Sequence, residues 1–205
     1  MVPVAPIVEG HGEVHALPLL LRRISDWLTP EFAADILHPI RIHRDRFINR
    51  DEEFSRILAL AAAKAGEGGR ILIILDADDD CPAVLENQIL ARARQKVPHR
   101  QLSVVMANRE YEAWFIAAAP SLDGQRGFAL RAGDELVDPE SPRDAKGWMK
   151  SRMTSGVYGE VTDQPAFSAR FDLQLAFDRS RSFRKLCREW KLAAKSSSSK
   201  STDRS

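Results

Sequence analysis

Hydrophobic and polar positions follow two different periods along the first 120 residues. Aliphatic residues dominate three runs without polar alternation, 2–8, 70–76 and 101–107, and a shorter apolar stretch lies at 39–44. Such runs, rich in Val, Ile and Leu, are typical of parallel strands buried on both faces. Pro3 and Pro6 favour an edge-like or irregular strand for the first run. The pattern predicts four strands.

Between these runs, apolar residues recur at steps of three and four. The first such series contains Val14, Leu17, Leu21, Ile24 and Leu28. It predicts a helix of about 14 residues that begins near His15, because Pro18 fits only in the first turns of a helix. Further helices are expected over 51–69, which has acids at its start and a Gly stop, after Pro82, and over 109–119.

Alternating strands and helices predict an α/β fold, because a parallel return between strands needs a crossover helix. Residues 1–120 therefore form the expected α/β core, a parallel sheet flanked by helices. From 121 to about 157 the pattern fades into Gly- and Pro-containing loops with one short helix near 143–153, and 160–191 is helical again. We expect residues 121–191 to pack on the core as a helical C-terminal extension, and the basic, Ser-rich stretch 192–205 to be disordered.

Composition narrows the class of protein. The chain has 205 residues, of which 44% are hydrophobic and 29% charged, as in an ordinary globular protein with one sizeable core. No run approaches 18 apolar residues, and the N-terminus lacks the pattern of a secretion signal. The two cysteines stand 106 positions apart, with no metal-ligand or redox spacing. We expect a cytoplasmic protein without a membrane span.

The net charge of +1 hides an asymmetry. Residues 179–205 hold nine Lys or Arg and two acids, a net charge of +7, which leaves −6 for residues 1–178. Two interpretations stay open: solvated charge on a tail, or contact with a polyanion such as nucleic acid.

Acidic residues follow three of the expected strands. Glu9 comes after the first run, Asp76 and Asp78 end the third, and Glu110 and Glu112 follow the fourth. Ligands of doubly wound sheets bind beyond the carboxyl ends of the strands, so these acids are expected to converge. Gathered carboxylates suit Mg²⁺, or Mn²⁺ in its place. The sequence predicts a metal site at this edge of the sheet.

Simpler interpretations exist for several of these residues. Asp80 can cap the helix at Pro82, Asp79 can be solvated, and Glu9 can be one of the acids common before a helix. Glu110 and Glu112 lie about 200° apart on a helix, so at most one faces the site. For Asp76 and Asp78 the alternative is a polar loop between a strand and a helix.

The segment 9–15, EGHGEVH, contains two further kinds of candidate residue. Gly10 lets the backbone approach a ligand closely. His11 and His15 do not form the HExxH zinc motif, and Gly12 argues against one continuous helix across both histidines. His11 and Arg109 are candidates for contact with a substrate phosphate.

Three segments in this order, "VEGHGEVHALPLLLRRI", "ILIILDADDDCP" and "REYEAWFIA", resemble the DUF4276 family, a TOPRIM-related group. The C-terminal "RSRSFRKLCREW" is similar to the closing motif of that family. The resemblance covers roughly residues 4–190. It implies the TOPRIM fold of topoisomerases, primases and OLD-type nucleases. It also implies a partner, because relatives often occur beside an ABC-type ATPase in bacterial anti-phage systems.

The resemblance assigns roles by position. Glu9 matches a glutamate that acts as general acid/base and contacts the metal, Asp76 and Asp78 match an Asp-x-Asp pair that holds Mg²⁺, and Glu112 is a third acidic ligand for which Glu110 competes. The implied activity is Mg²⁺-dependent hydrolysis of phosphodiester bonds in DNA or RNA. The neighbours of Tyr111 indicate that it packs within a helix and does not act as a topoisomerase nucleophile, which favours hydrolysis over a topoisomerase reaction.

Two alternatives stay open. The first is a regulatory or toxin-like subunit that binds metal and nucleotide without turnover and acts with the ATPase. The second is a binding module whose carboxylates are solvated. The sequence also leaves open whether the chain is a homo-oligomer.

Overall fold

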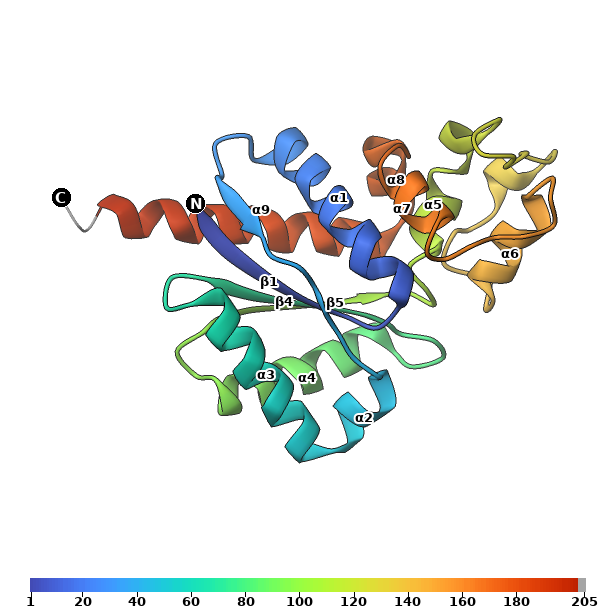
Figure 1. The fold of residues 1–205 in the computed structure, drawn as a ribbon. Helices are drawn as coiled ribbons and strands as arrows, with labels where there is room; N and C mark the ends of the chain where they lie inside the picture. Colours follow the sequence, from blue (N-terminus) through green and yellow to red (C-terminus); the bar gives the residue numbers. More distant parts are fainter. Residues whose placement is uncertain (203–205) are drawn as a thin grey trace.

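Five parallel strands form one sheet in the computed structural model, which describes the backbone of residues 1–202 and the side chains of residues 1–196 (Figure 1). Their order is β2-β1-β4-β5, and β3 also pairs with β1. The strands are β1 (Val2–Val8), β2 (Ala34–Ile36), β3 (Ile40–Arg41), β4 (Arg70–Asp76) and β5 (Gln101–Ala107). The predicted α/β class, a parallel sheet flanked by helices, is confirmed.

The strand expected over 39–44 is shorter than predicted. Only Ile40–Arg41 pairs with β1, and a second short strand, β2, precedes it. The chain turns into a helix at Arg44, which allows Phe47 to become fully buried. Burial of this aromatic side chain outweighs the edge-strand pairing that the remaining residues of 39–44 would have made.

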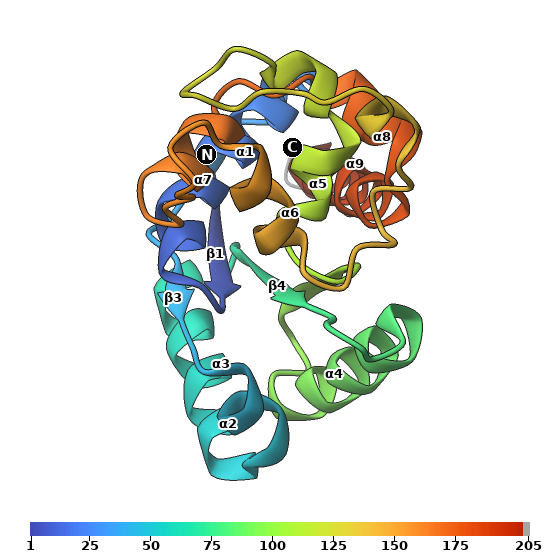
Figure 2. The ribbon, with the colours of Figure 1, turned by 90° about the vertical axis from the view of Figure 1, so that its right-hand side faces the viewer.

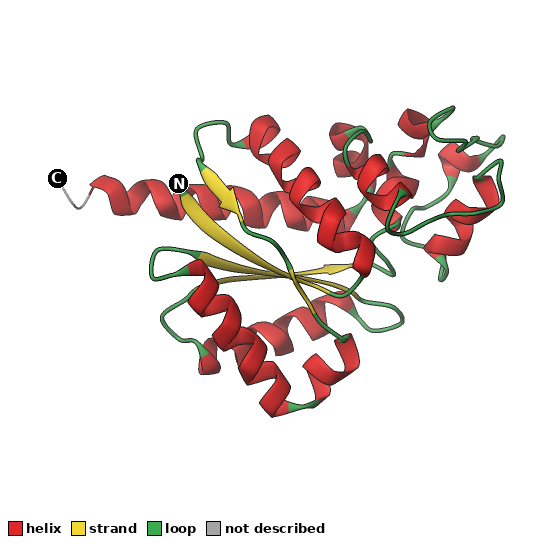
Figure 3. Cartoon of the chain, viewed as in Figure 1, coloured by secondary structure: helices red, strands yellow, loops and turns green. Residues whose placement is uncertain are grey.

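Helices cover both faces of the sheet (Figures 1 and 3). Side chains that alternate along β4 divide between two cores: Leu72 and Ile74 face one, and Ile71 and Ile73 face the other. The first core lies under α1 (His11–Leu28) and α9 (Arg181–Thr202); the second lies under α2 (Arg44–Asn49), α3 (Asp51–Ala65) and α4 (Pro82–Lys96). Every residue of β4 is buried, as expected of a central strand.

Helix α1 begins at His11, four residues before the predicted start, and it runs through both Gly12 and Pro18. The expectation that Gly12 interrupts the helix is therefore wrong. A Cβ added at Gly12 would lie 2.3 Å from the carbonyl oxygen of Glu160 and 2.2 Å from Oε1 of Gln164. Gly12 is present because the segment 160–164 packs directly on the first turn of α1, a contact that no local pattern reveals.

The segment after β5 forms short helices that extend the first core beyond the sheet. They are α5 (Ala113–Ala117), α6 (Ala145–Arg152), α7 (Asp163–Ser168), α8 (Leu173–Arg179) and two 3₁₀ turns, Ala119–Leu122 and Asp134–Leu136. Figure 2, which looks toward the ends of the strands, shows α5, α6 and α7 grouped on one side of them. Edge-to-face contacts join Phe115 to Phe167 and Phe171, so this segment is packed on the core.

Helix α9 continues through Thr202, so residues 192–202 are helical where the sequence predicted disorder. Ala193 is buried, and the Ser196 hydroxyl accepts a hydrogen bond from Nη1 of Arg70 at 2.7 Å. These contacts with the start of β4 stabilise the helix as far as Ser196. Residues 203–205 of the expected tail lie outside the described residues. Within residues 1–202, no helix combines the length and the apolar character needed to cross a membrane.

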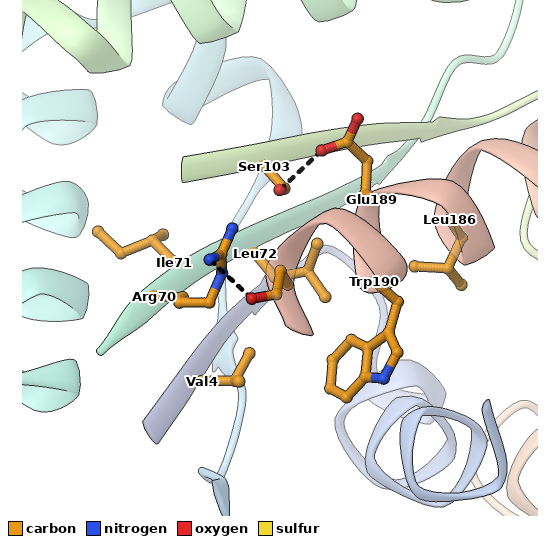
Figure 4. A pocket seen from close by; sticks show the side chains of 9 residues that line it. Val4, Arg70, Ile71, Leu72, Ser103, Leu186, Glu189 and Trp190 are labelled. Carbon is orange, nitrogen blue, oxygen red and sulfur yellow. Dashed lines mark hydrogen bonds between the residues drawn. The ribbon is translucent and has the colours of Figure 1, made fainter. Parts of the chain in front are cut away.

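A small cavity of about 10 Å³ lies between α9 and the starts of β1 and β4 (Figure 4). Its walls are mostly apolar, with Ser103 donating to Glu189 at 2.8 Å on one side. The volume is close to that of a single water-sized sphere. Since the cavity lies at the opposite ends of the strands from the predicted acidic site, we assign it to packing.

Candidate functional site

The strand order creates a crevice where the sequence places its acids. The chain leaves β1 toward β2 and β3 on one side, then crosses to β4 on the other side. Ligands of open parallel sheets bind beyond the carboxyl ends of the strands at such a switch point. Glu9 follows β1 and Asp76 ends β4, so the fold places these two residues at that point.

Four carboxyl groups interact electrostatically at this edge, and we call them the carboxylate cluster: Glu9, Glu13, Asp76 and Glu112. Asp76, Glu13 and Glu112 are buried, and Glu9 is half-buried. The backbone N–H of Tyr111 donates to Oδ1 of Asp76 at 2.8 Å, and the N–H of Glu9 donates to Oε2 of Glu13 at 3.3 Å. Residues from β1, α1, β4 and the start of α5 therefore share one site.

The sequence pattern did not point to Glu13. Starting the helix at His15 left Glu13 in a loop, whereas α1 places it on the buried face with Leu17, Leu20 and Ile24. Steps of four, three and four connect these positions, so a helix prolonged by one turn would have revealed a buried acid. Gly10 makes room for it, because a Cβ there would lie 2.9 Å from Oε1 of Glu13.

Burial raises the pKa of every group in the carboxylate cluster, and the charges of other cluster members add to the shift at Glu13 and Asp76. Burial, followed by the charge of Glu112, raises the pKa of Glu13 to about 8. Burial raises the pKa of Glu112 to about 7 although Lys146 opposes the shift. Burial and the charge of Glu13 raise the pKa of Asp76 well above its usual range, and burial followed by the charge of Asp78 raises the pKa of Glu9. Such a cluster is relieved either by protons or by a cation.

Two carboxylate oxygens of the cluster lack a hydrogen-bond partner. Oε2 of Glu9 and Oε2 of Glu112 are buried without a hydrogen bond among the described residues. The other oxygen of Glu112 is held by the Tyr158 hydroxyl at 2.9 Å and by Nε2 of Gln164 at 3.0 Å. A buried carboxylate oxygen without a partner is costly, and hard cations prefer this donor. The donor set fits Mg²⁺ or Mn²⁺.

The geometry of a metal site is not already complete. Among the residues the structure describes, no three His, Cys, Asp or Glu side chains are arranged so that they could hold a metal ion. The cluster therefore has the right donor atoms, but its side chains must rotate toward one another before they share a cation.

Asp78 lies at the rim and outside the buried cluster. Its side chain is 56% exposed, its φ is +50°, and Nη1 of Arg44 lies 3.6 Å from Oδ2. Its charge still raises the pKa of Glu9, after burial, which places it beside that residue. The structure thus brings Asp76 together with Glu9 and Glu112, and leaves Asp78 facing solvent at their border.

The neighbouring aspartates have structural partners. Asp79 pairs with Arg109 and Arg143, each at 2.8 Å, so it is bound in ion pairs and not simply solvated. Asp80 pairs with Arg44. The interpretation of Asp80 as a helix cap is wrong, because Cys81 is the N-cap residue of α4 and no side chain caps that helix.

The competition between Glu110 and Glu112 is resolved. Glu112 is fully buried within the cluster, whereas Oε2 of Glu110 accepts a hydrogen bond from the backbone N–H of Lys146 at 2.8 Å. Glu110 therefore holds the start of α6 in place, and Glu112 faces the site.

The candidates for substrate contact divide into free and committed side chains. His11 is exposed at the start of α1, and Gly10 is the N-cap residue of that helix. Arg109 has φ +68° and donates to the carbonyl of Asp78 at 3.0 Å as well as to Asp79. Nη1 of Arg109 thus stabilises the turn after β4.

Two cations that the sequence did not single out lie at the site. Arg44 has a side chain only 12% exposed, and its Nε donates to the carbonyl oxygen of Asp76 at 3.0 Å. Lys146, on α6, lies near Glu112 and Asp76, whose charges raise its pKa although burial lowers it. Arg44 ends the stretch 39–44 for which a strand was expected, and Lys146 lies in the short helix expected near 143–153, but neither pattern shows that the side chain reaches acids of other segments.

These features define an α/β protein with a parallel sheet and a buried carboxylate cluster at the carboxyl ends of its strands. The chain belongs to the family described as "Domain of unknown function (DUF4276)", whose model matches residues 8–190. The resemblance to this family is thereby confirmed. No curated protein and no solved structure matches the chain.

Proposed function

We propose that the protein is a Mg²⁺-dependent nuclease that hydrolyses phosphodiester bonds of DNA or RNA. The observation that carries this proposal is the carboxylate cluster at the switch point of the sheet, with unpartnered oxygens on Glu9 and Glu112. Buried acids that repel one another without a matching set of cations are typical of functional sites. The resemblance to TOPRIM proteins, whose activity rests on a Glu and an Asp-x-Asp pair at this edge, supports the same activity.

The proposed roles follow from burial and position. Asp76, Glu112 and Glu9 hold the ion, and Asp78 joins them from the rim. Mg²⁺, when bound, supplies charge stabilisation at the scissile phosphate and a more acidic water. Glu9 transfers a proton. This role suits a half-buried carboxyl group, because its raised pKa lies closer to neutral pH than the pKa of a free glutamate. Arg44 fixes the backbone of Asp76, and Lys146 offsets part of the negative charge before the metal enters.

The setting of this activity is proposed from the family resemblance alone. The proposed partner is an ABC-type or OLD-type ATPase. The proposed context is anti-phage defence in the bacterial cytoplasm. The proposed ancestry is a TOPRIM-type fold. The parallel sheet with acids at its carboxyl edge is compatible with that ancestry.

A second candidate function is a regulatory subunit that binds metal and nucleotide without cutting. The incomplete metal geometry of the described residues favours it. In that case the ATPase partner would bring the carboxylates together, and the isolated chain would bind Mn²⁺ weakly.

The test is cleavage of supercoiled DNA, a structured RNA and tRNA in Mg²⁺, Mn²⁺ or EDTA. We expect cleavage that EDTA abolishes and that Asp76→Asn and Glu112→Gln reduce at least a hundredfold, since each removes a charged metal ligand. Glu67→Gln, an exposed acid in the turn after α3, is the matched control and should cut like the wild type. Equal cleavage by all variants would contradict the proposal. Mn²⁺ binding without cleavage, with or without an ATPase, would favour the regulatory subunit.

A further inference from the structure

Five basic side chains form a single stripe along α9, which we call the α9 stripe: Arg181, Arg184, Arg188, Lys191 and Lys195. They follow one another at intervals of three and four residues. At about 100° and 1.5 Å per residue, the stripe occupies an arc of about 80° and is about 21 Å long. The buried residues of α9, such as Phe183, Leu186 and Trp190, lie on the opposite side of the helix.

The α9 stripe lacks acidic partners. Among the side chains of residues 1–196, none of the five bases forms an ion pair, whereas Lys185 on the flank of the helix pairs with Glu86 at 2.7 Å and with Glu189 at 3.0 Å. Arg184 donates to the carbonyl oxygens of Phe177 and Asp178 at 2.8 and 2.9 Å, which fixes its position and leaves its charge uncompensated.

A surface groove of about 440 Å³ accompanies the stripe where α9 adjoins α8. Phe177 and Cys187 contribute to its wall, and the remaining lining is basic: Arg181, Arg184, Lys185, Arg188 and Lys191. A groove with one sign of charge concentrates the field and attracts an extended ligand of the opposite charge.

The stripe begins beside the edge of the sheet that carries the carboxylate cluster. Glu140 links the two: it accepts a hydrogen bond from Nδ2 of Asn108, just after β5, at 3.0 Å and from the backbone N–H of Ser182 at 2.8 Å. From there α9 runs back along the sheet toward the other ends of the strands (Figure 1). An extended, negatively charged ligand that lies along the stripe would therefore reach the edge of the sheet that carries the carboxylate cluster.

We propose that the α9 stripe binds the sugar-phosphate backbone of the nucleic acid that the carboxylate cluster cuts. The inference rests on the proposed function for that last step. At about 3.4 Å per phosphate of one strand, 21 Å faces about six phosphates, which matches a row of five cations. A membrane surface is a poorer fit, because the apolar face of α9 is already buried and, among residues 181–196, Leu192 is the only large apolar side chain exposed beside the stripe.

The test is fluorescence anisotropy with labelled DNA duplex, single-stranded DNA and single-stranded RNA of about 20 nucleotides, all in EDTA so that cleavage plays no part. The variant carries Arg181→Gln, Arg188→Gln and Lys191→Gln. We expect its affinity to fall at least tenfold at low salt and, on duplex DNA, its log K against log salt slope to become shallower by about three. Arg46→Gln, Arg50→Gln and Arg94→Gln together remove the same charge from the opposite face and should change affinity less than twofold.

Each outcome separates this inference from the proposed function. The inference is overturned if the stripe variant binds as tightly as the wild type, or if the control variant loses as much affinity. It is also overturned if the wild type binds no nucleic acid. Stripe-dependent binding without any cleavage supports the inference and contradicts the nuclease. If the triple variant fails to fold, the pair Arg188→Gln and Lys191→Gln serves instead, with an expected slope change of about two on duplex DNA.

Discussion

At the scale of single residues, Glu13 shows how the buried carboxylate cluster affects the free energy of folding. It is 2% exposed, it faces Glu112 and Glu9, and its pKa is raised to about 8 by burial and then by the charge of Glu112. In the unfolded chain the pKa returns to 4.5. Between these two values the folded protein without metal holds a proton that the unfolded chain has released, so folding and protonation are linked at this residue.

That linkage predicts the pH dependence of stability. Stability from Glu13 is fully present below about pH 4.5 and is lost as the pH rises toward 8, because the unfolded chain binds fewer protons. In EDTA, the free energy of unfolding should fall on the order of 1 kcal/mol per pH unit in this window. Glu13→Gln should flatten the slope, and Glu67→Gln should leave it unchanged. Urea unfolding at several pH values measures this, and identical slopes in wild type and Glu13→Gln would contradict it.

At the scale of elements, the first turn of α1 packs closely against the segment 160–164. The carbonyl of Glu160 and the side chain of Gln164 approach the helix so closely that only a residue without a Cβ fits at position 12. The same Gln164 holds Glu112 at 3.0 Å. Gln164 therefore packs on the first turn of α1 and also orients a carboxylate of the site.

Gly12→Ala tests this contact. The added methyl group would push α1 and the segment 160–164 apart, which we expect to cost about 1–3 kcal/mol of unfolding free energy. Gly68→Ala is the matched control, because a Cβ there meets nothing within 4 Å, and it should be neutral or slightly stabilising. Urea denaturation of both variants gives the comparison. Equal stabilities of the two variants would contradict a tight contact between Gly12 and the segment 160–164.

At the scale of the whole molecule, the parts on either side of residue 121 share one hydrophobic core. Val4 and Leu20, before the boundary, lie in the same cluster as Phe167 and Leu186 behind it. The boundary expected near 121 therefore separates a regular from an irregular pattern, and the two segments pack as one body.

A fragment of residues 1–120 should accordingly fail to fold cooperatively. It would expose the face of the sheet that α9 covers and leave Trp114 without its hydrogen bond to Ser182. We expect strong binding of a hydrophobic dye and no sharp urea transition, in contrast to the full chain. A fragment with a sharp transition and low dye binding would contradict this shared core.

The sequence predicts those elements whose position depends on local hydrophobic periodicity. The strands β1, β4 and β5 and the helix α3 begin at the predicted residues, and the acids at the strand ends follow from them. Glu13, Arg44 and Lys146 were missed because their roles depend on contacts between segments far apart in the chain. The prolonged α9 was missed for the same reason, since Arg70, more than 100 residues earlier, bonds to Ser196.

The hydrogen bonds that hold Glu112 also affect when the acidic edge can form during synthesis of the chain. Their donors, Tyr158 and Gln164, lie 46 and 52 residues beyond it, and α9 follows later still. During synthesis the strands leave the ribosome well before these partners, so β1, β4 and β5 can pair while the acidic edge is still unformed. If the protein is the nuclease proposed above, the carboxylate that Tyr158 and Gln164 orient would be in place only after the segment beyond α6 has emerged, so cleavage activity would appear late in synthesis.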